Sequence, residues 1–286
     1  IVDKDKKIVA QGEKECKIRK REKVAVTQNL TVVHPLSWSV DSPNLYSLVT
    51  EVIQDGDRMD CTEETFGIRS IQFDAQRGFL LNGKVLKLKG GCIHHDNGPL
   101  GAMAFDRAEE RKVELHKAAG FNALRMAHNP PSPALLDACD RLGILVIDEA
   151  FDVWRYGHFK EDYSKHFDTL WREDLKKMIL RDRNHPSVIM WSIGNEIKHN
   201  ETEEMALLSG KLADYVRSID NTRPVTAGVN AVSEKKDAYL NTLDVAGYNY
   251  SPNEYVSGHQ RHPEQLIYAS ESYSSEASVS YTHLTL

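Results

Sequence analysis

From about residue 75 onward, short apolar runs alternate with longer segments of helical periodicity, and this alternation restricts the fold more than any other feature. Most of the apolar runs do not alternate in polarity, which is typical of parallel strands buried on both faces. Repeated strand–helix units of this kind predict a (β/α) barrel. The seven predicted strands span residues 85–93, 122–126, 144–148, 188–193, 225–228, 244–248 and 266–270.

Boundary signals along the chain support this assignment. Ser132 followed by Pro133 predicts a helix start, and Gly143 predicts the end of the same helix. Asp106 with Glu109 predicts a start resembling a capping box for a helix over residues 106–119. Just before the barrel, Asn82-Gly83 predicts a two-residue hairpin turn.

The alternative architecture is an open doubly wound sheet. That fold would carry a glycine-rich phosphate-binding turn after its first strand, and the segment 89–94 lacks this pattern. A complete barrel has eight strands. Residues 75–278 supply only seven of them, so we expect a TIM barrel that lacks its last strand.

Residues 1–74 have a different rhythm. Short β-rich pieces occur at 24–27 and 30–33, and a longer run at 45–53 is followed by a turn at Asp55-Gly56. Strands at this spacing predict a small β-sandwich. No titratable cluster stands out in this region, so a structural role is expected.

Composition excludes several classes of function. The chain is 41% hydrophobic with a net charge of -6 and no basic half, so nucleic acid is not an expected partner. No apolar run reaches the length of a membrane span. The cysteines are scattered without metal-binding spacing, and Cys92 and Cys139 lie in apolar stretches that predict buried thiols.

The two ends of the chain carry their own expectations. Residues 279–286 match a translated sequencing adapter, so natural sequence is expected to stop near Ser278. Without an eighth strand, the first and seventh strands are expected to be unpaired edges. The chain as given is therefore expected to fold poorly and to be inactive.

Polar side chains follow six of the seven strands at their carboxyl ends, which meet at one rim of a barrel. Glu196 and Glu271 would face each other across this rim. Retaining glycosidases need two carboxyl groups about 5–5.5 Å apart, one as proton donor and one as nucleophile. The polar residues at the rim are His94, His95, Asp96, Arg125, His128, Asn129, Asp148, Glu149, Asn195, Glu196, Tyr248, Asn249, Tyr250 and Glu271.

Three neighbours fit that chemistry. Arg125 and Tyr250 are candidate partners that keep Glu271 ionised. Asn195 is a candidate ligand of the sugar 2-hydroxyl, where hydrogen bonds strengthen in the transition state.

Two long motifs carry a resemblance to a known family. They are Asn122-Ala-Leu-Arg-Met-Ala-His-Asn-Pro-Pro-Ser-Pro, continuing through residues 139–149, and the stretch 182–196 ending in Ser-Ile-Gly-Asn-Glu. The chain resembles family 2 glycoside hydrolases of the β-galactosidase/β-glucuronidase group over residues 20–278. The resemblance implies an immunoglobulin-like sandwich over residues 1–74 and a catalytic barrel over residues 75–278. A jelly-roll-like sugar-binding domain normally precedes these two.

The resemblance also implies roles for particular residues. Glu196 matches the general acid/base and Glu271 the nucleophile, with Glu276 as a lower-ranked neighbour. His128 matches a sugar-contacting histidine, and His95 with Asp96 matches a histidine–acid pair. The loop 151–167 carries aromatic residues, and Trp154 among them is predicted to stack on an aglycone sugar.

The predicted activity is hydrolysis of terminal non-reducing β-D-galactose residues, because Pro99 stands where glucuronidases carry an Asp. A β-glucuronidase or a β-mannosidase is the alternative. Val153 stands where metal-dependent galactosidases carry a Glu ligand, so neither a metal nor a cofactor is predicted. A homo-oligomer is compatible with the sequence, which indicates no compartment.

Two further classes stay open. One is a catalytically inactive carbohydrate-binding protein that keeps the fold. The other is a metal-dependent hydrolase using His94, His95, His128 and Glu149.

Overall fold

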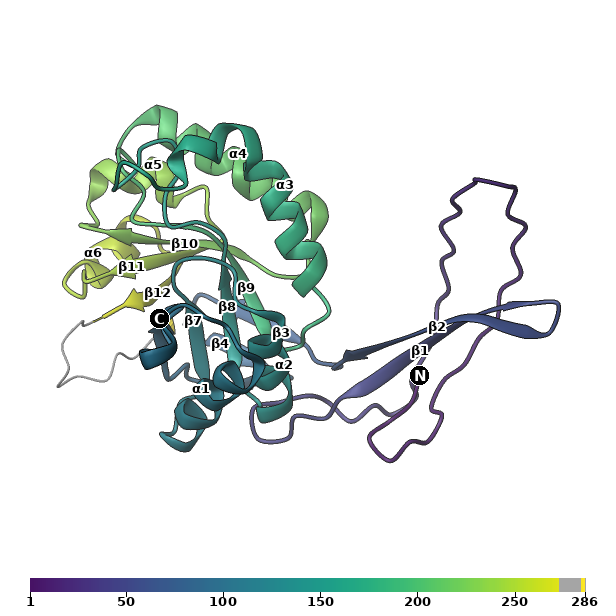
Figure 1. Ribbon diagram of the computed structural model, residues 1–286. Helices are drawn as coiled ribbons and strands as arrows, with labels where there is room; N and C mark the ends of the chain where they lie inside the picture. The colour runs from purple at the N-terminus through teal and green to yellow at the C-terminus, as the bar shows by residue number, and fades with distance from the viewer. Residues whose placement is uncertain (273–283, 286) are drawn as a thin grey trace.

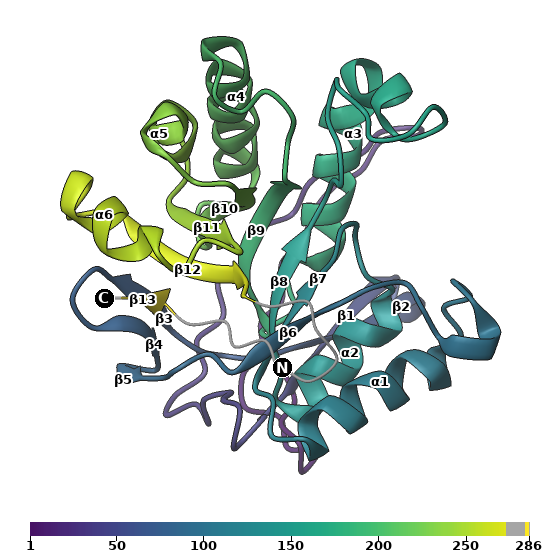
Figure 2. The same cartoon turned by 90° about the vertical axis from the view of Figure 1, so that its left-hand side faces the viewer.

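The computed structural model describes residues 1–272 and 284–285. Seven parallel strands curl in sequence order into an incomplete barrel, with helices fanned around the outside (Figures 1 and 2). The strands are β6 (Gly90–Ile93), β7 (Ala123–Met126), β8 (Leu145–Glu149), β9 (Val188–Asn195), β10 (Val225–Asn230), β11 (Val245–Asn249) and β12 (Leu266–Glu271). The consecutive order confirms the barrel and excludes the doubly wound sheet, whose strand order reverses.

The helices follow the predicted alternation. Each strand from β6 to β11 is followed by a helix, and the longest, α3 and α4, lie beside each other in Figure 1. The helices are α1 (Asp106–Ala118), α2 (Pro133–Leu142), α3 (Ser164–Asp182), α4 (Glu203–Ile219), α5 (Asp237–Leu240) and α6 (Glu254–Arg261), with short 3-10 turns η1 (Gly98–Leu100) and η2 (Glu234–Lys236). None of these described helices has the length and apolar character of a membrane span.

One of the two edges of the curled sheet differs from expectation, and the other, β6, agrees with it. β12 is not an unpaired edge, because β13 (Leu284–Thr285) pairs with it antiparallel at Ile267 and Tyr268. Among the described residues β6 pairs with one strand, β7. The Cys92 thiol of β6 lies 3.3 Å from the carbonyl oxygen of Ser270 on β12, so the two ends of the curl come close together. That the chain alone folds poorly and is inactive stays a prediction.

Two apolar cores stabilise the barrel. The larger core lies between the sheet and its helices and includes Val146, Trp171 and Leu212. The smaller core contains residues such as Trp38, Ile147 and Tyr268. The Trp38 indole nitrogen donates to the carbonyl of Asp140 at 2.8 Å, and this bond holds the segment around Trp38 against the barrel.

The N-terminal region contains one long hairpin, β1 (Tyr46–Gln54) with β2 (Asp57–Phe66), which projects away from the barrel in Figure 1. Its turn is at Asp55-Gly56 as predicted. The strands predicted at 24–27 and 30–33 are wrong, because both segments lack strand pairing. Val24 and Val26 are exposed, so their β propensity has no apolar layer to pack against.

A small sheet of β3 (Ile71–Asp74), β4 (Gly78–Leu81) and β5 (Lys84–Val85) connects the hairpin to the barrel. Asn82 and Gly83 have φ of 51° and 76°, which confirms the predicted two-residue turn. Val85 belongs to this hairpin, so the first barrel strand begins at Gly90 rather than at residue 85.

Both ends of α2 agree with the prediction from the sequence, whereas the predicted cap at the start of α1 is wrong. The Ser132 hydroxyl accepts a hydrogen bond from the Leu135 amide at 3.2 Å, and Gly143 has a left-handed φ of 72°. At α1 the cap position is Phe105, whose side chain cannot cap, and Asp106 lies in the first turn. Glu109 pairs instead with Asn97 and Lys112.

Candidate active site

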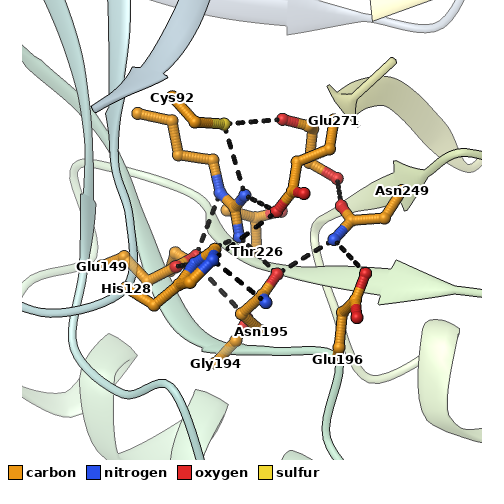
Figure 3. Close-up of polar contacts among 12 residues, drawn as sticks. Cys92, His128, Glu149, Gly194, Asn195, Glu196, Thr226, Asn249 and Glu271 are labelled. Atoms are coloured by element: carbon orange, nitrogen blue, oxygen red, sulfur yellow. Dashed lines mark hydrogen bonds and ion pairs between the residues drawn. The ribbon is translucent and has the colours of Figure 1, made fainter. Parts of the chain in front are cut away.

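Glu196 and Glu271 lie at the same rim of the barrel, one directly after β9 and the other at the last position of β12. Figure 3 shows the side chains of His128, Glu149, Asn195, Asn249 and both glutamates gathered there. The structure therefore brings together the two predicted carboxylates and most of the polar residues that sequence analysis placed at strand ends.

Glu271 is held in an ionised state by its neighbours. Its Oε1 accepts from Arg125 Nη1 at 2.7 Å, and its Oε2 accepts from the Tyr250 hydroxyl at 2.5 Å. Burial by itself raises the pKa of this carboxyl, but the charge of Arg125 and the hydrogen bonds from Tyr250 and Arg125 outweigh burial, so the pKa lies below its ordinary value. Both predicted partners of Glu271 are confirmed as contacts.

Arg125 is the central cation of the rim and is fully buried. Besides Glu271, it donates from Nε and Nη2 to Glu149 Oε2 at 3.0 and 2.6 Å, and from Nη2 to Asn195 Oδ1 at 2.9 Å. A buried cation is costly unless it is paired and hydrogen-bonded, and here two carboxylates satisfy it. The ion pair with Glu149 therefore holds the Arg125 guanidinium in place, and the guanidinium in turn holds the Glu271 carboxylate.

Glu149 orients His128. Because a carboxylate only accepts hydrogen bonds, the 2.7 Å contact between Glu149 Oε1 and His128 Nδ1 places the imidazole proton on Nδ1. The other ring nitrogen, Nε2, then faces the site, 3.9 Å from Glu271 Oε1. Sequence analysis located Glu149 at the rim but assigned it no part in orienting His128.

A chain of amides connects the two glutamates. Asn195 Oδ1 accepts from both Arg125 Nη2 and Asn249 Nδ2, the latter at 3.0 Å. Asn249 is itself oriented by the Ser270 hydroxyl, which donates to its Oδ1 at 2.5 Å. With its oxygen occupied, Asn195 presents its NH₂ group toward the side of His128 Nε2, 3.4 Å away.

Glu196 receives one amide donor on each carboxylate oxygen. Asn249 Nδ2 donates to Oε1 and Asn230 Nδ2 donates to Oε2, both at 3.0 Å. Its backbone has a positive φ of 45°, and its amide donates to the Gly228 carbonyl at 2.8 Å. Sequence analysis missed Asn230 because it ended the fifth strand at residue 228, whereas β10 continues to Asn230.

The predicted histidine–acid pair is placed differently. His95 Nε2 lies 3.2 Å from the Pro130 carbonyl, and exposed Asp96 accepts from the Gly98 amide. It is His94 that packs edge-on against His128, with ring centroids 5.2 Å apart. Burial, followed by the neighbouring His128, lowers the pKa of His94. The side chain facing the site is thus His94, one residue earlier than predicted.

The structure also contradicts the stacking role of Trp154. Its side chain is 1% exposed, and its indole nitrogen donates to the Ile193 carbonyl at 2.8 Å. Phe167 and Tyr239 pack against its ring. No face of the indole is free for a sugar, so Trp154 is a core residue beneath the rim.

The four residues of the alternative metal site do not present free ligands together. Both Glu149 oxygens are engaged, and His95 is directed to the Pro130 carbonyl. Within residues 1–272, one group of three ligand-type side chains, Asp137, Asp140 and His185, has its ligand atoms within 4.8 Å of one another. His185 precedes β9, so this group lies at the opposite end of the strands, where Asp140 bonds His185 and the Ser187 amide.

Comparison with known families agrees with this fold and rim. The model described as "Glycosyl hydrolases family 2, TIM barrel domain" matches residues 74–271, and the one described as "Glycosyl hydrolases family 2" matches residues 1–69. The chain belongs to glycosyl hydrolase family 2. The two matches confirm the predicted order of a sandwich domain followed by an incomplete TIM barrel.

Individual relatives carry two kinds of name. A β-galactosidase from Bacteroides ovatus is 41% identical over 281 residues, covering 87% of this chain and 33% of that protein. A putative β-glucuronidase from Formosa agariphila is 39% identical over 232 residues, covering 80% of this chain and 21% of that protein.

A crystal structure gives the same picture of the fold. A family 2 member from Bacteroides cellulosilyticus superposes with a TM-score of 0.93 at 59% identity, covering 96% of this chain and 36% of that one. The chain spans about a third or less of the length of these three proteins.

Proposed function

We propose that the protein is a retaining β-glycosidase with Glu271 as nucleophile and Glu196 as general acid/base. The observation that carries the proposal is the state of Glu271: a carboxylate at the barrel rim whose pKa is lowered by buried Arg125 and hydrogen-bonded Tyr250. A nucleophilic carboxylate must be ionised to attack, and this environment keeps it so. The catalytic unit is the barrel, assigned to residues 75–278, and residues 1–74 are the sandwich domain that precedes it.

The first step forms a covalent intermediate. A Glu271 oxygen attacks the anomeric carbon while the glycosidic C–O bond breaks, and Glu196 gives its proton to the departing oxygen. The NH₂ group of Asn195, whose one contact in the described structure is the 3.4 Å approach to His128 Nε2, donates to the 2-hydroxyl of the sugar. His94 and His128 line the same sugar position.

The second step releases the sugar. Glu196, now ionised, takes a proton from water, and the water oxygen bonds to the anomeric carbon as the bond to Glu271 breaks. Two inversions at the anomeric carbon leave its configuration unchanged. No other reactant is needed besides water.

We propose β-galactosides with a terminal non-reducing galactose as substrates. The support is Pro99 at the position where glucuronidases carry an Asp, together with the β-galactosidase relative. The second candidate is β-glucuronide hydrolysis, favoured by the similarity to a putative β-glucuronidase.

The test is a set of nitrophenyl β-glycosides assayed with the full-length protein. We expect turnover of the galactoside in preference to the glucuronide and mannoside. Glu271→Ala is expected to lower kcat by about 10⁴-fold or more, because covalent catalysis is lost. The matched control is Glu264→Ala, which removes an exposed glutamate seven residues earlier, in the loop before β12.

Wild-type activity that survives in Glu271→Ala would show the nucleophile assignment to be wrong. Binding of galactosides without turnover of any glycoside would instead indicate a carbohydrate-binding protein. Loss of activity on chelation would favour the metal-dependent reading.

A further inference from the structure

Glu196 is held by donors from two different strands, and one of these donors has a support of its own. Asn249, on β11, is fully buried and oriented by Ser270. Asn230, at the end of β10, lies closer to solvent. The side chain that supports Asn230 is Lys236, which ends the 3-10 turn η2.

Lys236 contacts Asn230 through two acceptors. Its ammonium donates to the Asn230 carbonyl at 2.7 Å and approaches the side-chain Oδ1 at 3.5 Å. Lys236 is half-buried: burial lowers its pKa, while the carboxylates of Glu201 and Glu196 favour its charged form. The lysine therefore lies over the end of β10 with its charge directed toward the acid/base region.

The donor-only character of lysine decides which way the Asn230 amide points. A side-chain amide can be flipped by half a turn, which exchanges its oxygen and its NH₂ group. An ammonium can only donate, so it attracts the amide oxygen and leaves the NH₂ group for Glu196 Oε2. The flipped amide would place its oxygen against a carboxylate oxygen and turn its NH₂ group toward the ammonium, while the bond from Lys236 to the backbone carbonyl of Asn230 would remain.

We propose that Lys236 and Asn230 form a positioning arm for Glu196, in which Lys236 selects the amide orientation of Asn230 and Asn230 fixes the carboxylate for proton transfer. This inference rests on the proposed role of Glu196 as general acid/base. Neither residue forms a bond to the sugar or transfers a proton in the proposed steps, so both act through Glu196.

The positioning arm matters because proton transfer requires the Glu196 carboxyl group to point at the leaving oxygen. With Asn249 on Oε1 and Asn230 on Oε2, rotation about the carboxylate is restrained from both sides. Without Asn230, one oxygen is free and the carboxyl samples orientations from which the leaving oxygen is out of reach. Misplacement of a catalytic group by about 1 Å can cost on the order of 100-fold in rate.

The experiment compares two leaving groups in the full-length protein. With phenyl β-galactoside, whose leaving oxygen needs a proton, we expect kcat/KM to fall about 10-fold in Lys236→Met and about 10- to 100-fold in Asn230→Ala. With 2,4-dinitrophenyl β-galactoside, whose leaving group needs no proton, kcat/KM should stay within about 2-fold. Azide, a nucleophile that needs no general base, should raise kcat of both variants on this second substrate.

The matched control is Lys235→Met, which removes the neighbouring exposed lysine of the same turn and should behave as wild type on both substrates. A merely structural role would lower kcat/KM equally on both substrates and leave azide without effect. That result, or a Lys236→Met variant indistinguishable from Lys235→Met, would overturn the inference. Wild-type protein that hydrolyses neither substrate would overturn the proposed function, and this inference with it.

Discussion

At the scale of single residues, Gly228 is the position where the rim tolerates no side chain. A Cβ there would lie 2.7 Å from Arg125 Nη2, 2.7 Å from Asn195 Oδ1 and 3.0 Å from Asn249 Oδ1. These three atoms belong to the hydrogen-bond chain that connects the two glutamates. The absence of a side chain at Gly228 therefore leaves the space in which the Arg125 guanidinium and the amides of Asn195 and Asn249 contact each other.

Gly228→Ala is expected to lower kcat by about 100-fold, because the methyl group displaces Arg125 and the amides by the kind of distance that disturbs catalysis. The measurement is steady-state kinetics beside a thermal melt. Gly210→Ala in α4 is the control: its Cβ meets Thr242 at an ordinary 3.7 Å, so activity should be unchanged and stability should rise by about 0.5–1 kcal/mol. Full activity in Gly228→Ala would show that a methyl group at this position does not displace Arg125 and the two amides.

At the scale of elements, two glycines end neighbouring helices under different constraints. Gly120 follows α1 with φ of 88°, and no atom lies within 4 Å of a Cβ built there. Gly143 ends α2 with φ of 72°, and its Cβ would lie 2.4 Å from the Val40 carbonyl oxygen. The first position demands only a left-handed backbone, whereas the second also requires close approach of the N-terminal segment.

We expect Gly120→Ala to destabilise the fold by about 1–2 kcal/mol, the cost of a left-handed alanine. Gly143→Ala should cost more, because the methyl group also drives Val40 away from the barrel. Urea unfolding of the two variants in parallel gives their losses in free energy of unfolding. Because both variants carry the same backbone strain, the difference between these losses measures the clash with Val40. Equal losses would mean that the segment around Val40 moves aside without cost.

At the scale of the whole molecule, a buried carboxyl couples stability to pH. Asp148 on β8 is fully buried, neither of its carboxyl oxygens has a hydrogen-bond partner in the described structure, and the negative charge of Asp182 at the end of α3 acts on it. Asp182 is held by the fork of Arg181 at 2.6 and 2.7 Å. Burial, and then the charge of Asp182, raise the pKa of Asp148 well above its ordinary value.

The sign of the effect follows from proton binding. Between the unfolded pKa, about 3.9, and the raised folded pKa, the native state holds a proton that the unfolded chain releases, so this stabilisation falls as pH rises, by up to about 1.4 kcal/mol per unit. Asp148→Asn removes the titration and should gain stability relative to wild type between pH 5 and pH 8. Urea unfolding of both proteins at pH 5 and pH 8 tests this. A difference in free energy of unfolding between variant and wild type that is the same at both pH values would contradict it.

The sequence by itself determined the strand order, the helix ends at Ser132 and Gly143, and the presence of Glu196, Glu271, Arg125 and Tyr250 at one rim. It could do so because apolar runs and turn residues are local signals, and because parallel strands bring their carboxyl ends to one edge. Asn195 was located by the same rule.

Only the tertiary structure decided which of two adjacent histidines faces the site, and that Trp154 lies in the core. It also decided that Asn230 reaches Glu196, since β10 runs two residues further than the strand predicted at 225–228. Each depends on side-chain direction and packing between elements distant in the chain, which local sequence does not encode. The same holds for the segments 24–27 and 30–33, whose strand propensity found no apolar partner layer.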